Sequence, residues 1–328
     1  MKGTGSGSSP RSCWWRHDHL LPQHPEGTVV TVGSFDGVHR GHEAVLTEIA
    51  ARARAAGRRS VLVTFDPHPM AVVNPAAAPQ VLTTGPERRE ILAQTGLDYA
   101  VLLHFDRALA AMPPERFVRE ILVAGCGMRE LVIGHDHGFG QGRQGDVELL
   151  GRLGAELGFA VDVVPALEVD GHAVSSTLVR RAVAGGDLAT AARLLGRRYF
   201  ATGEVVSGDG RGKTLGFPTA NLSGIPDRKL LPPDGVYAVR VEWRGGRADG
   251  MMNQGGKPTF QHAERSLEVH LFEHTGSLYG EWLKVEWVTR LRDVQRFASL
   301  DALRTQLDRD RSSARAALAA AATGTLST

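Results

Sequence analysis

Two histidines three residues apart, His39 and His42, stand where the sequence predicts the start of a helix. Side chains with this spacing lie on one helical face, and the free N–H groups at a helix start attract phosphate. Gly41 lets the backbone approach an anion without a Cβ in the way. Two imidazoles could then donate hydrogen bonds to oxygens that gain charge when a phosphorus centre is attacked. The same pair could simply cap a helix, so the short motif alone leaves both interpretations open.

A second polar constellation occupies residues 208–221, in the order GDGRGKTLGFPTAN. Its glycines and basic residues could surround phosphate with backbone N–H groups. Thr219 and Asn221 supply neutral oxygens, which suit Mg²⁺ that is also bound by phosphate and water. The glycines alone are equally typical of a flexible hairpin loop.

Glu268 lies in a predicted strand, 266–272, on the face opposite Leu267 and Val269. His270 shares the face of Glu268. A carboxylate in such a place is most often a solvated charge.

The elements that must position these residues follow two patterns. In the first half, short apolar runs predict strands over 28–32, 60–65, 99–105, 131–133 and 159–164. Helices are predicted over 42–56, 87–94, 114–124, 147–157, 176–184 and 187–195. Buried strands that alternate with helices imply a parallel sheet covered on both faces. Ligands bind such sheets beyond the carboxyl ends of the strands, where His39 stands.

After Gly196 the pattern changes to strand, turn, strand. Runs at 200–207, 235–243, 247–252, 266–272 and 281–289 predict a closed antiparallel barrel. A final helix is predicted over about 294–309, and the Ala-rich stretch over 313–328 is predicted to be a flexible tail.

Composition excludes several classes of protein. The 328 residues carry a net charge of +2 and two cysteines, which argues against a nucleic-acid partner and a disulfide framework. No apolar run is long enough to span a membrane. Residues 1–27 are Gly/Ser-rich at the start, lack a signal-peptide core and are predicted to be a disordered extension. The predicted location is the cytoplasm.

Residues 33–42 read GSFDGVHRGH directly after a predicted strand, which resembles the nucleotidyltransferase superfamily. The F-D-G-V-H wording is similar to the adenylyltransferase half of the bifunctional riboflavin kinase/FAD synthetases, although the family usually has Asn at the position of Ser34. Three later segments also resemble that family in order: TFDPHP at 64–69, GHDHGFG at 134–140 and VSSTLVR at 174–180.

This resemblance implies an α/β nucleotidyltransferase domain with a Rossmann-like parallel sheet. It implies that His39 and His42 stabilise the α-phosphate transition state, while Ser176, Thr177 and Arg180 hold the triphosphate. The implied ATP or flavin contacts are Gly33, Ser34, Phe35, Asp36, Gly37, Gly41, Pro67, His68, Asp136, Phe139, Gly140 and Ser175. No general base is obvious, and none is needed, because the phosphate of FMN is already an anion.

The string GKTLGFPTAN resembles the riboflavin kinase signature. The resemblance implies that Thr219 and Asn221 hold the metal and nucleotide phosphates and that Glu268 is the catalytic base. Arg292 is implied to neighbour the isoalloxazine ring, in a segment where the family usually reads R-x-E and this chain has Val294. The implied nucleotide or flavin contacts are Gly212, Lys213, Gly216 and Pro218.

The sequence therefore predicts an FMN adenylyltransferase domain over 28–195 and a riboflavin kinase barrel with a C-terminal helix over 196–312. The chain would phosphorylate riboflavin to FMN and adenylylate FMN to FAD. It would use ATP and Mg²⁺ and release pyrophosphate in the second reaction. Its expected partners are these small molecules, with no nucleic acid and no membrane, and a homo-oligomer is left open.

Three alternatives stay open at this point. Only one of the two activities could be retained, because Ser34 and Val294 depart from the family pattern. The chain could instead be a flavin- or nucleotide-binding module without turnover. A nucleic-acid-binding barrel is disfavoured by the near-neutral charge.

Overall fold

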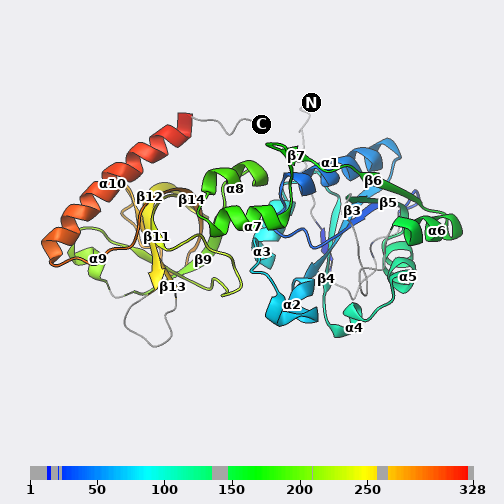
Figure 1. Ribbon diagram of the computed structural model, residues 1–328, viewed down its shortest axis with the longest axis horizontal. Coiled ribbons are helices and arrows are strands. Elements are labelled where there is room, and N and C mark those ends of the chain that lie inside the picture. Colours follow the sequence, from blue (N-terminus) through cyan, green and yellow to red (C-terminus); the bar gives the residue numbers. More distant parts are fainter. Residues whose placement is uncertain are drawn as a thin grey trace, which may run out of the picture. The chain divides into compact units, whose positions relative to one another are not determined.

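The computed structural model describes residues 13–15, 21, 24–134, 147–208, 210–256 and 265–323. The chain divides into two compact units, Met1–Ser176 and Thr177–Thr328. A sheet with helices forms the first unit, and a barrel with a long helix forms the second (Figure 1). The domain boundary predicted at residues 195 and 196 stays a prediction.

A parallel sheet organises the first unit. Its strands are β1 (Cys13–Trp15), β2 (Thr28–Val32), β3 (Arg59–Asp66), β4 (Tyr99–His104), β5 (Met128–Gly134) and β6 (Ala160–Val164). They lie in the order β1-β4-β3-β2-β5-β6, and every neighbouring pair is parallel. After β2 the chain forms β3 and then β4 on one side of β2, and it crosses back to form β5 on the other side. Such a switch point is where open sheets bind ligands, and the predicted fold class is confirmed.

Helices and short turns connect the strands. They are α1 (Arg40–Ala55), α2 (Pro69–Val73), η1 (Pro75–Ala77), α3 (Gly85–Leu92), α4 (Arg107–Ala110), α5 (Pro114–Phe117), the π-helix η2 (Val118–Gly125) and α6 (Val147–Leu157). A small ribbon, β7 (Glu168–Val169) and β8 (His172–Ala173), precedes α7 (Ser176–Ala184) and α8 (Leu188–Leu195). The single helix predicted over 114–124 is therefore two segments, α5 and η2.

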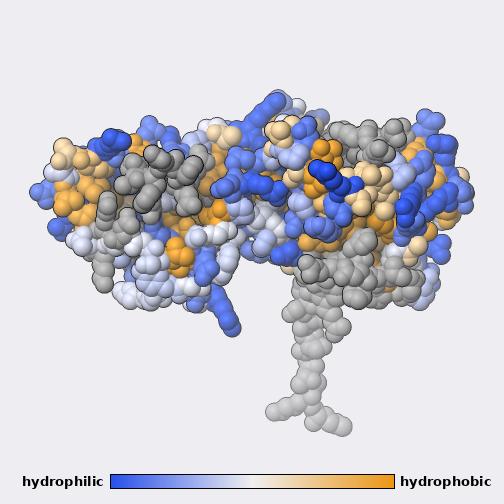
Figure 2. Space-filling model, turned by 90° about the horizontal axis from the view of Figure 1, so that it is seen from below, coloured by the Kyte–Doolittle hydropathy of each residue, from blue (hydrophilic) through white to orange (hydrophobic). Residues whose placement is uncertain are grey.

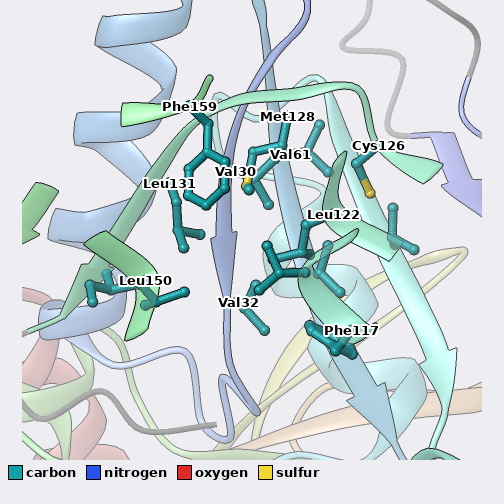
Figure 3. Packing of buried hydrophobic residues seen from close by; sticks show 14 of the residues in the cluster. Val30, Val32, Val61, Phe117, Leu122, Cys126, Met128, Leu131, Leu150 and Phe159 are labelled. Carbon is teal, nitrogen blue, oxygen red and sulfur yellow. The ribbon is translucent and has the colours of Figure 1, made fainter. Parts of the chain in front are cut away.

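The core of the first unit forms around its central strands. Val30 of β2, Val61 of β3 and Leu131 of β5 are fully buried, as expected for a sheet covered on both faces. Figure 3 shows these side chains packed with Phe117 and Leu122 from α5 and η2. Each such side chain contributes roughly 1.5–3 kcal/mol by leaving water, so this packing stabilises the sheet from which the polar loops extend.

The stretch predicted to be a disordered extension, 1–27, contains ordered segments. Residues Cys13–Trp15 form β1, which pairs with β4. Leu21 is buried and its N–H donates to the carbonyl of Gly125 at 3.3 Å. The structure differs from the expectation at these residues because an edge strand can be completed by a short segment that has little hydrophobic periodicity of its own.

A closed antiparallel barrel forms the second unit. Its strands are β9 (Phe200–Val206), β10 (Ala220–Ser223), β11 (Gly235–Trp243), β12 (Gly246–Gly256), β13 (Arg265–Leu271) and β14 (Trp282–Arg292). The order β10-β13-β12-β11-β14-β9 closes because β9 also pairs with β10. A short helix, α9 (Arg211–Thr214), lies within the glycine-rich segment that precedes β10. The predicted barrel is confirmed, with β10 as an additional strand.

The C-terminal helix corrects two sequence predictions. The helix α10 spans Leu300–Thr323, so it begins later than residue 294 and continues through most of the predicted flexible tail, 313–328. Ala314 and Leu318, four residues apart, are buried against Phe217, Met251 and other barrel residues. Alanine is the best helix former, and one apolar face is enough to hold the helix on the barrel.

The surface mixes polar and apolar residues. Figure 2 shows hydrophobic and hydrophilic residues side by side on one face. Tyr279 and Trp282 are exposed aromatic side chains of the second unit. Within the described ranges, no helix has both the length and the hydropathy that a membrane span requires.

Candidate active sites

The two histidines of the first motif lie face to face at the start of α1. His39 is the N-cap, and its Nδ1 accepts a hydrogen bond from the His42 backbone N–H at 3.3 Å. Their rings stack with centroids 3.6 Å apart. An imidazole nitrogen that accepts cannot carry the proton, so neutral His39 has its N–H on Nε2. That donor and the helix N-terminus suit an anionic group.

The loop between β2 and α1 holds its residues in uncommon backbone conformations. Phe35 has φ +47° and Val38 has φ +39°, values that cost energy for residues with a Cβ and persist only when their surroundings enforce them. The Phe35 ring stacks on His42 with centroids 4.4 Å apart. A Cβ at Gly41 would lie 3.2 Å from His39 Nδ1, so a larger residue there would press on the histidine pair and require a small shift of the His39 ring.

Asp36 points into the protein and organises this loop. Its side chain is buried, and its oxygens accept from the N–H groups of Leu82 and Thr83 at 2.9–3.0 Å and from the Thr83 hydroxyl at 3.2 Å. The Ser176 hydroxyl donates to the Asp36 carbonyl at 2.9 Å. The Asp36 carboxylate therefore holds the loop together, and the predicted ligand contact of Asp36 stays a prediction.

Arg88 of α3 is a residue that sequence reasoning missed. It is buried, and its guanidinium donates to the carbonyls of Ser34 at 2.9 Å and Phe65 at 2.7 Å. Ser34 lies in the loop after β2 and Phe65 near the carboxyl end of β3, so one side chain links this loop to the neighbouring strand. Burial lowers the pKa of Arg88, while the charges of Asp66 and Asp36 oppose that shift.

The other predicted residues of the first site lie after β3, at the start of α7 or outside the described part of the chain. Pro67 and His68 directly follow β3, the neighbour of β2, and His68 caps α2 through a 3.2 Å bond from Met70 N–H. Ser176 begins α7, with Ser175 before it and Thr177 and Arg180 after it on the same helix. Asp136, Phe139 and Gly140 lie outside the described residues.

The second site is built on the outer face of the barrel. Asn221 of β10 pairs directly with Glu268 of β13, so the two side chains share a face. Leu267 and Val269 point to the buried interior, at 2% and 1% exposure. The structure thus brings together the predicted metal ligand and the predicted base, and it leaves Glu268 half-buried at the surface.

Close backbone packing explains the glycines of this region. A Cβ at residue 208 would collide with the Asn221 carboxamide, and one at Gly212 would collide with the Phe217 carbonyl. Gly216 has φ +83°, which favours glycine. The backbone of Lys213 is part of α9, while its side chain lies outside the described part of the chain.

His270 anchors the segment that leads to Thr219 and Asn221. Its Nδ1 lies 2.8 Å from the carbonyl of Pro218, and since a carbonyl accepts, the ring donates there. Phe217 packs edge-on against the same ring. Burial lowers the pKa of His270, and the Arg311 charge acts in the same direction, while the bond to Pro218 opposes them. A neutral histidine therefore holds this segment.

Arg292 holds the C-terminal helix against the barrel. Its guanidinium forms a two-pronged ion pair with buried Asp310 of α10, at 2.9 and 2.6 Å. Val294, which stands where the family usually has Glu, packs near Gly255 of β12. The predicted contact between Arg292 and a flavin ring stays a prediction.

Comparison with known proteins decides the family. Residues 21–178 match the FAD synthetase family, and residues 195–318 match the riboflavin kinase family. Proteins described as bifunctional riboflavin kinase/FMN adenylyltransferase from Escherichia coli (strain K12) and Pseudomonas fluorescens are each 40% identical, over 90% and 93% of this chain and 95% and 97% of their own. The chain belongs to this bifunctional family. The resemblance and the two-domain transferase predicted from the sequence are confirmed.

More distant relatives agree over similar lengths. The relative of the same description from Bacillus subtilis (strain 168) is 32% identical over 90% of this chain and 94% of its own. A crystal structure described as a macrolide-efflux protein from Streptococcus pneumoniae is 31% identical, with a TM-score of 0.82 over 92% of this chain and 98% of that one. Its fold is thus shared across both units.

We predict that replacing Arg88 impairs adenylyl transfer. In Arg88→Met the buried carbonyls of Ser34 and Phe65 lose their donor, at a cost of roughly 1–3 kcal/mol. A rise of this size in the activation free energy of adenylyl transfer lowers FAD formation from FMN about ten- to hundred-fold. Arg88→Lys keeps the charge, and its rate of FAD formation should lie between those of the wild type and Arg88→Met. Steady-state kinetics with FMN and ATP measure the effect.

Arg89→Met is the matched control, because Arg89 is the partly exposed neighbour on α3. Phosphorylation of riboflavin by the same samples checks that the protein is folded. Equal FAD synthesis in Arg88→Met and Arg89→Met would contradict a positioning role for Arg88.

The lowered pKa of His270 predicts a pH dependence of stability. Between its folded pKa and the ordinary value of 6.5, the unfolded chain binds a proton that the folded chain does not. The contribution of His270 to stability is therefore present above pH 6.5 and is lost as the pH falls toward the folded pKa. In His270→Gln, the drop in unfolding free energy between about pH 8 and about pH 5 should be smaller than in the wild type. Urea unfolding followed by fluorescence measures both, and equal drops would refute this assignment.

Proposed function

We propose that the second unit phosphorylates riboflavin to FMN and that the first unit adenylylates FMN to FAD, each with ATP. The observation that carries the proposal is the stacked His39–His42 pair at the start of α1, beyond the carboxyl end of β2. Asn221 beside Glu268 on the barrel supports the kinase half in the same way. Membership of the bifunctional family supports both halves together.

In adenylyl transfer, a phosphate oxygen of FMN attacks the α-phosphorus of ATP. The bond from that phosphorus to the bridging oxygen breaks, and pyrophosphate leaves. His39 Nε2 and the N-terminus of α1 stabilise the charge that builds on the α-phosphate. Because the attacking oxygen is already ionised at neutral pH, the residues need to position and stabilise rather than remove a proton.

The start of α7 is the proposed triphosphate site. The Ser176 hydroxyl hydrogen is engaged by the Asp36 carbonyl. Ser176 would therefore contribute its backbone N–H at the helix start, with the exposed Thr177 hydroxyl and the Arg180 charge completing the anion site.

In the kinase reaction, Glu268 accepts the proton of the terminal ribityl hydroxyl as its oxygen attacks the γ-phosphorus of ATP, and ADP leaves. Thr219 and Asn221 are half-buried and offer neutral side-chain oxygens, which fit Mg²⁺ together with phosphate oxygens. When bound, Mg²⁺ neutralises the charge of the transferring phosphoryl group. The neutral His270 holds the Pro218 carbonyl and so keeps Thr219 and Asn221 in place.

We also propose that the chain acts in the cytoplasm, on small molecules and without a nucleic-acid partner. ATP and flavins are the substrates proposed for its sites, and a net charge of +2 is too small to favour a nucleic-acid partner.

Two substitutions should separate the activities. In His42→Ala the stacked pair is lost, and conversion of FMN to FAD should fall about hundred-fold or more while riboflavin phosphorylation is unchanged. In Asn221→Ala, phosphorylation of riboflavin should fall instead, while conversion of FMN to FAD should be unchanged. Chromatographic assays with riboflavin and FMN as separate substrates measure each reaction.

Exposed residues provide matched controls: His172→Ala on β8 for the first unit and Ser223→Ala on β10 for the second. If His42→Ala left FAD formation intact, the histidine pair would not be the adenylyltransferase site. If Asn221→Ala left FMN formation intact, Asn221 would not belong to the riboflavin kinase site.

A further inference from the structure

A row of side chains crosses five strands on the outer face of the barrel. Strand pairing places Asn221 opposite Glu268, Glu268 opposite Asn253, and Asn253 opposite Val236. Val236 in turn is opposite Arg292 of β14. Directly paired residues point to the same face, so these side chains form one line across the outer face of the barrel. In this line Glu268 stands between two asparagines, and Val236 is buried.

Asn253 belongs to the open surface of this row. Its sequence neighbours Met252 and Gln254 are fully buried in the barrel, whereas Asn253 itself is exposed. Its carboxamide makes no hydrogen bond to the residues that the structure describes. Strand β12 is nevertheless firmly held beside it, because the Gln254 amide group bonds to the Pro232 carbonyl and to the Trp287 indole N–H. A fixed backbone thus presents an exposed polar side chain next to Glu268.

The order of the row distinguishes the two sides of Glu268. On one side of Glu268 stands Asn221, the proposed partner of Mg²⁺ and the ATP phosphates. On the other side stand Asn253, then Val236, then Arg292. Because adjacent strands lie about 4.8 Å apart, Glu268 and Arg292 are separated by roughly 14 Å across the surface. Across the strands, Asn253 is therefore the nearest side chain to Glu268 on the side away from Asn221, where a phosphoryl acceptor would lie.

We propose that Asn253 binds the ribityl chain of riboflavin and sets the acceptor specificity of the kinase. This inference rests on the kinase function proposed above. A carboxamide both donates and accepts hydrogen bonds, as a hydroxyl does, so Asn253 matches the hydroxyl beside the one that Glu268 deprotonates. Its carboxamide does not titrate, so Asn253 does not compete with Glu268 for the proton of the reacting hydroxyl.

Steady-state kinetics of Asn253→Ala test the assignment. The KM for riboflavin should rise about ten-fold, as expected for one lost hydrogen bond in a site. The KM for ATP and the pH profile of kcat should not change, because neither the phosphate side nor Glu268 is altered. Ser223→Ala, an exposed change on β10 opposite Glu204, is the control and should leave both KM values unchanged.

A riboflavin analogue that lacks the hydroxyl next to the terminal one makes the test specific. The wild type should use this analogue about ten-fold less well than riboflavin, whereas Asn253→Ala should treat the two alike. Thermal unfolding of each variant checks that the barrel is intact.

Three results would overturn the assignment: an unchanged riboflavin KM in Asn253→Ala, a rise in the ATP KM instead, or undiminished discrimination against the analogue. A wild type that does not phosphorylate riboflavin at all would instead refute the kinase function and, with it, this inference.

Discussion

The candidate active site of the first unit depends on the burial of two opposite charges, Asp36 and Arg88, beneath one loop. Burying a charge is costly unless it is fully hydrogen-bonded. Asp36 meets that requirement with donors from Leu82 and Thr83, and Arg88 with the carbonyls of Ser34 and Phe65. Those bonds over-determine the loop, which is why Phe35 and Val38 can keep positive φ angles. The His39–His42 pair inherits its position from this arrangement.

The barrel positions its candidate site residues in a different way. Its site residues stand on paired strands, so register alone places Asn221, Glu268 and Asn253 side by side. The segment before β10 is not held by strand pairing, and there a neutral His270 donates a hydrogen bond to the carbonyl of Pro218. A buried charge holds the site of the first unit, whereas a histidine kept neutral by burial holds that of the second. The two sites should therefore respond differently to acid.

Much of this could be predicted from sequence, because long apolar periodicities and consecutive motifs are local signals. Strand β2 and helices α6 and α7 match their predicted bounds. What was missed depends on distant partners. Arg88 bonds to a carbonyl that lies 54 residues away in the sequence. The strand β10 is only four residues long. Asn253 is recognised as a candidate site residue only because its strand pairs it with Glu268. The predicted tail was wrong for a related reason, since Ala314 is buried only because the barrel lies beneath it.

The central claim is that one chain carries both reactions in sequence. The most direct measurement is a chromatographic time course of the purified protein with riboflavin, ATP and Mg²⁺. The account predicts that FMN appears first and FAD follows at its expense. Accumulation of FMN with no FAD would contradict the role given to the His39–His42 site. Untouched riboflavin, with added FMN still converted to FAD, would contradict the role given to Asn221 and Glu268.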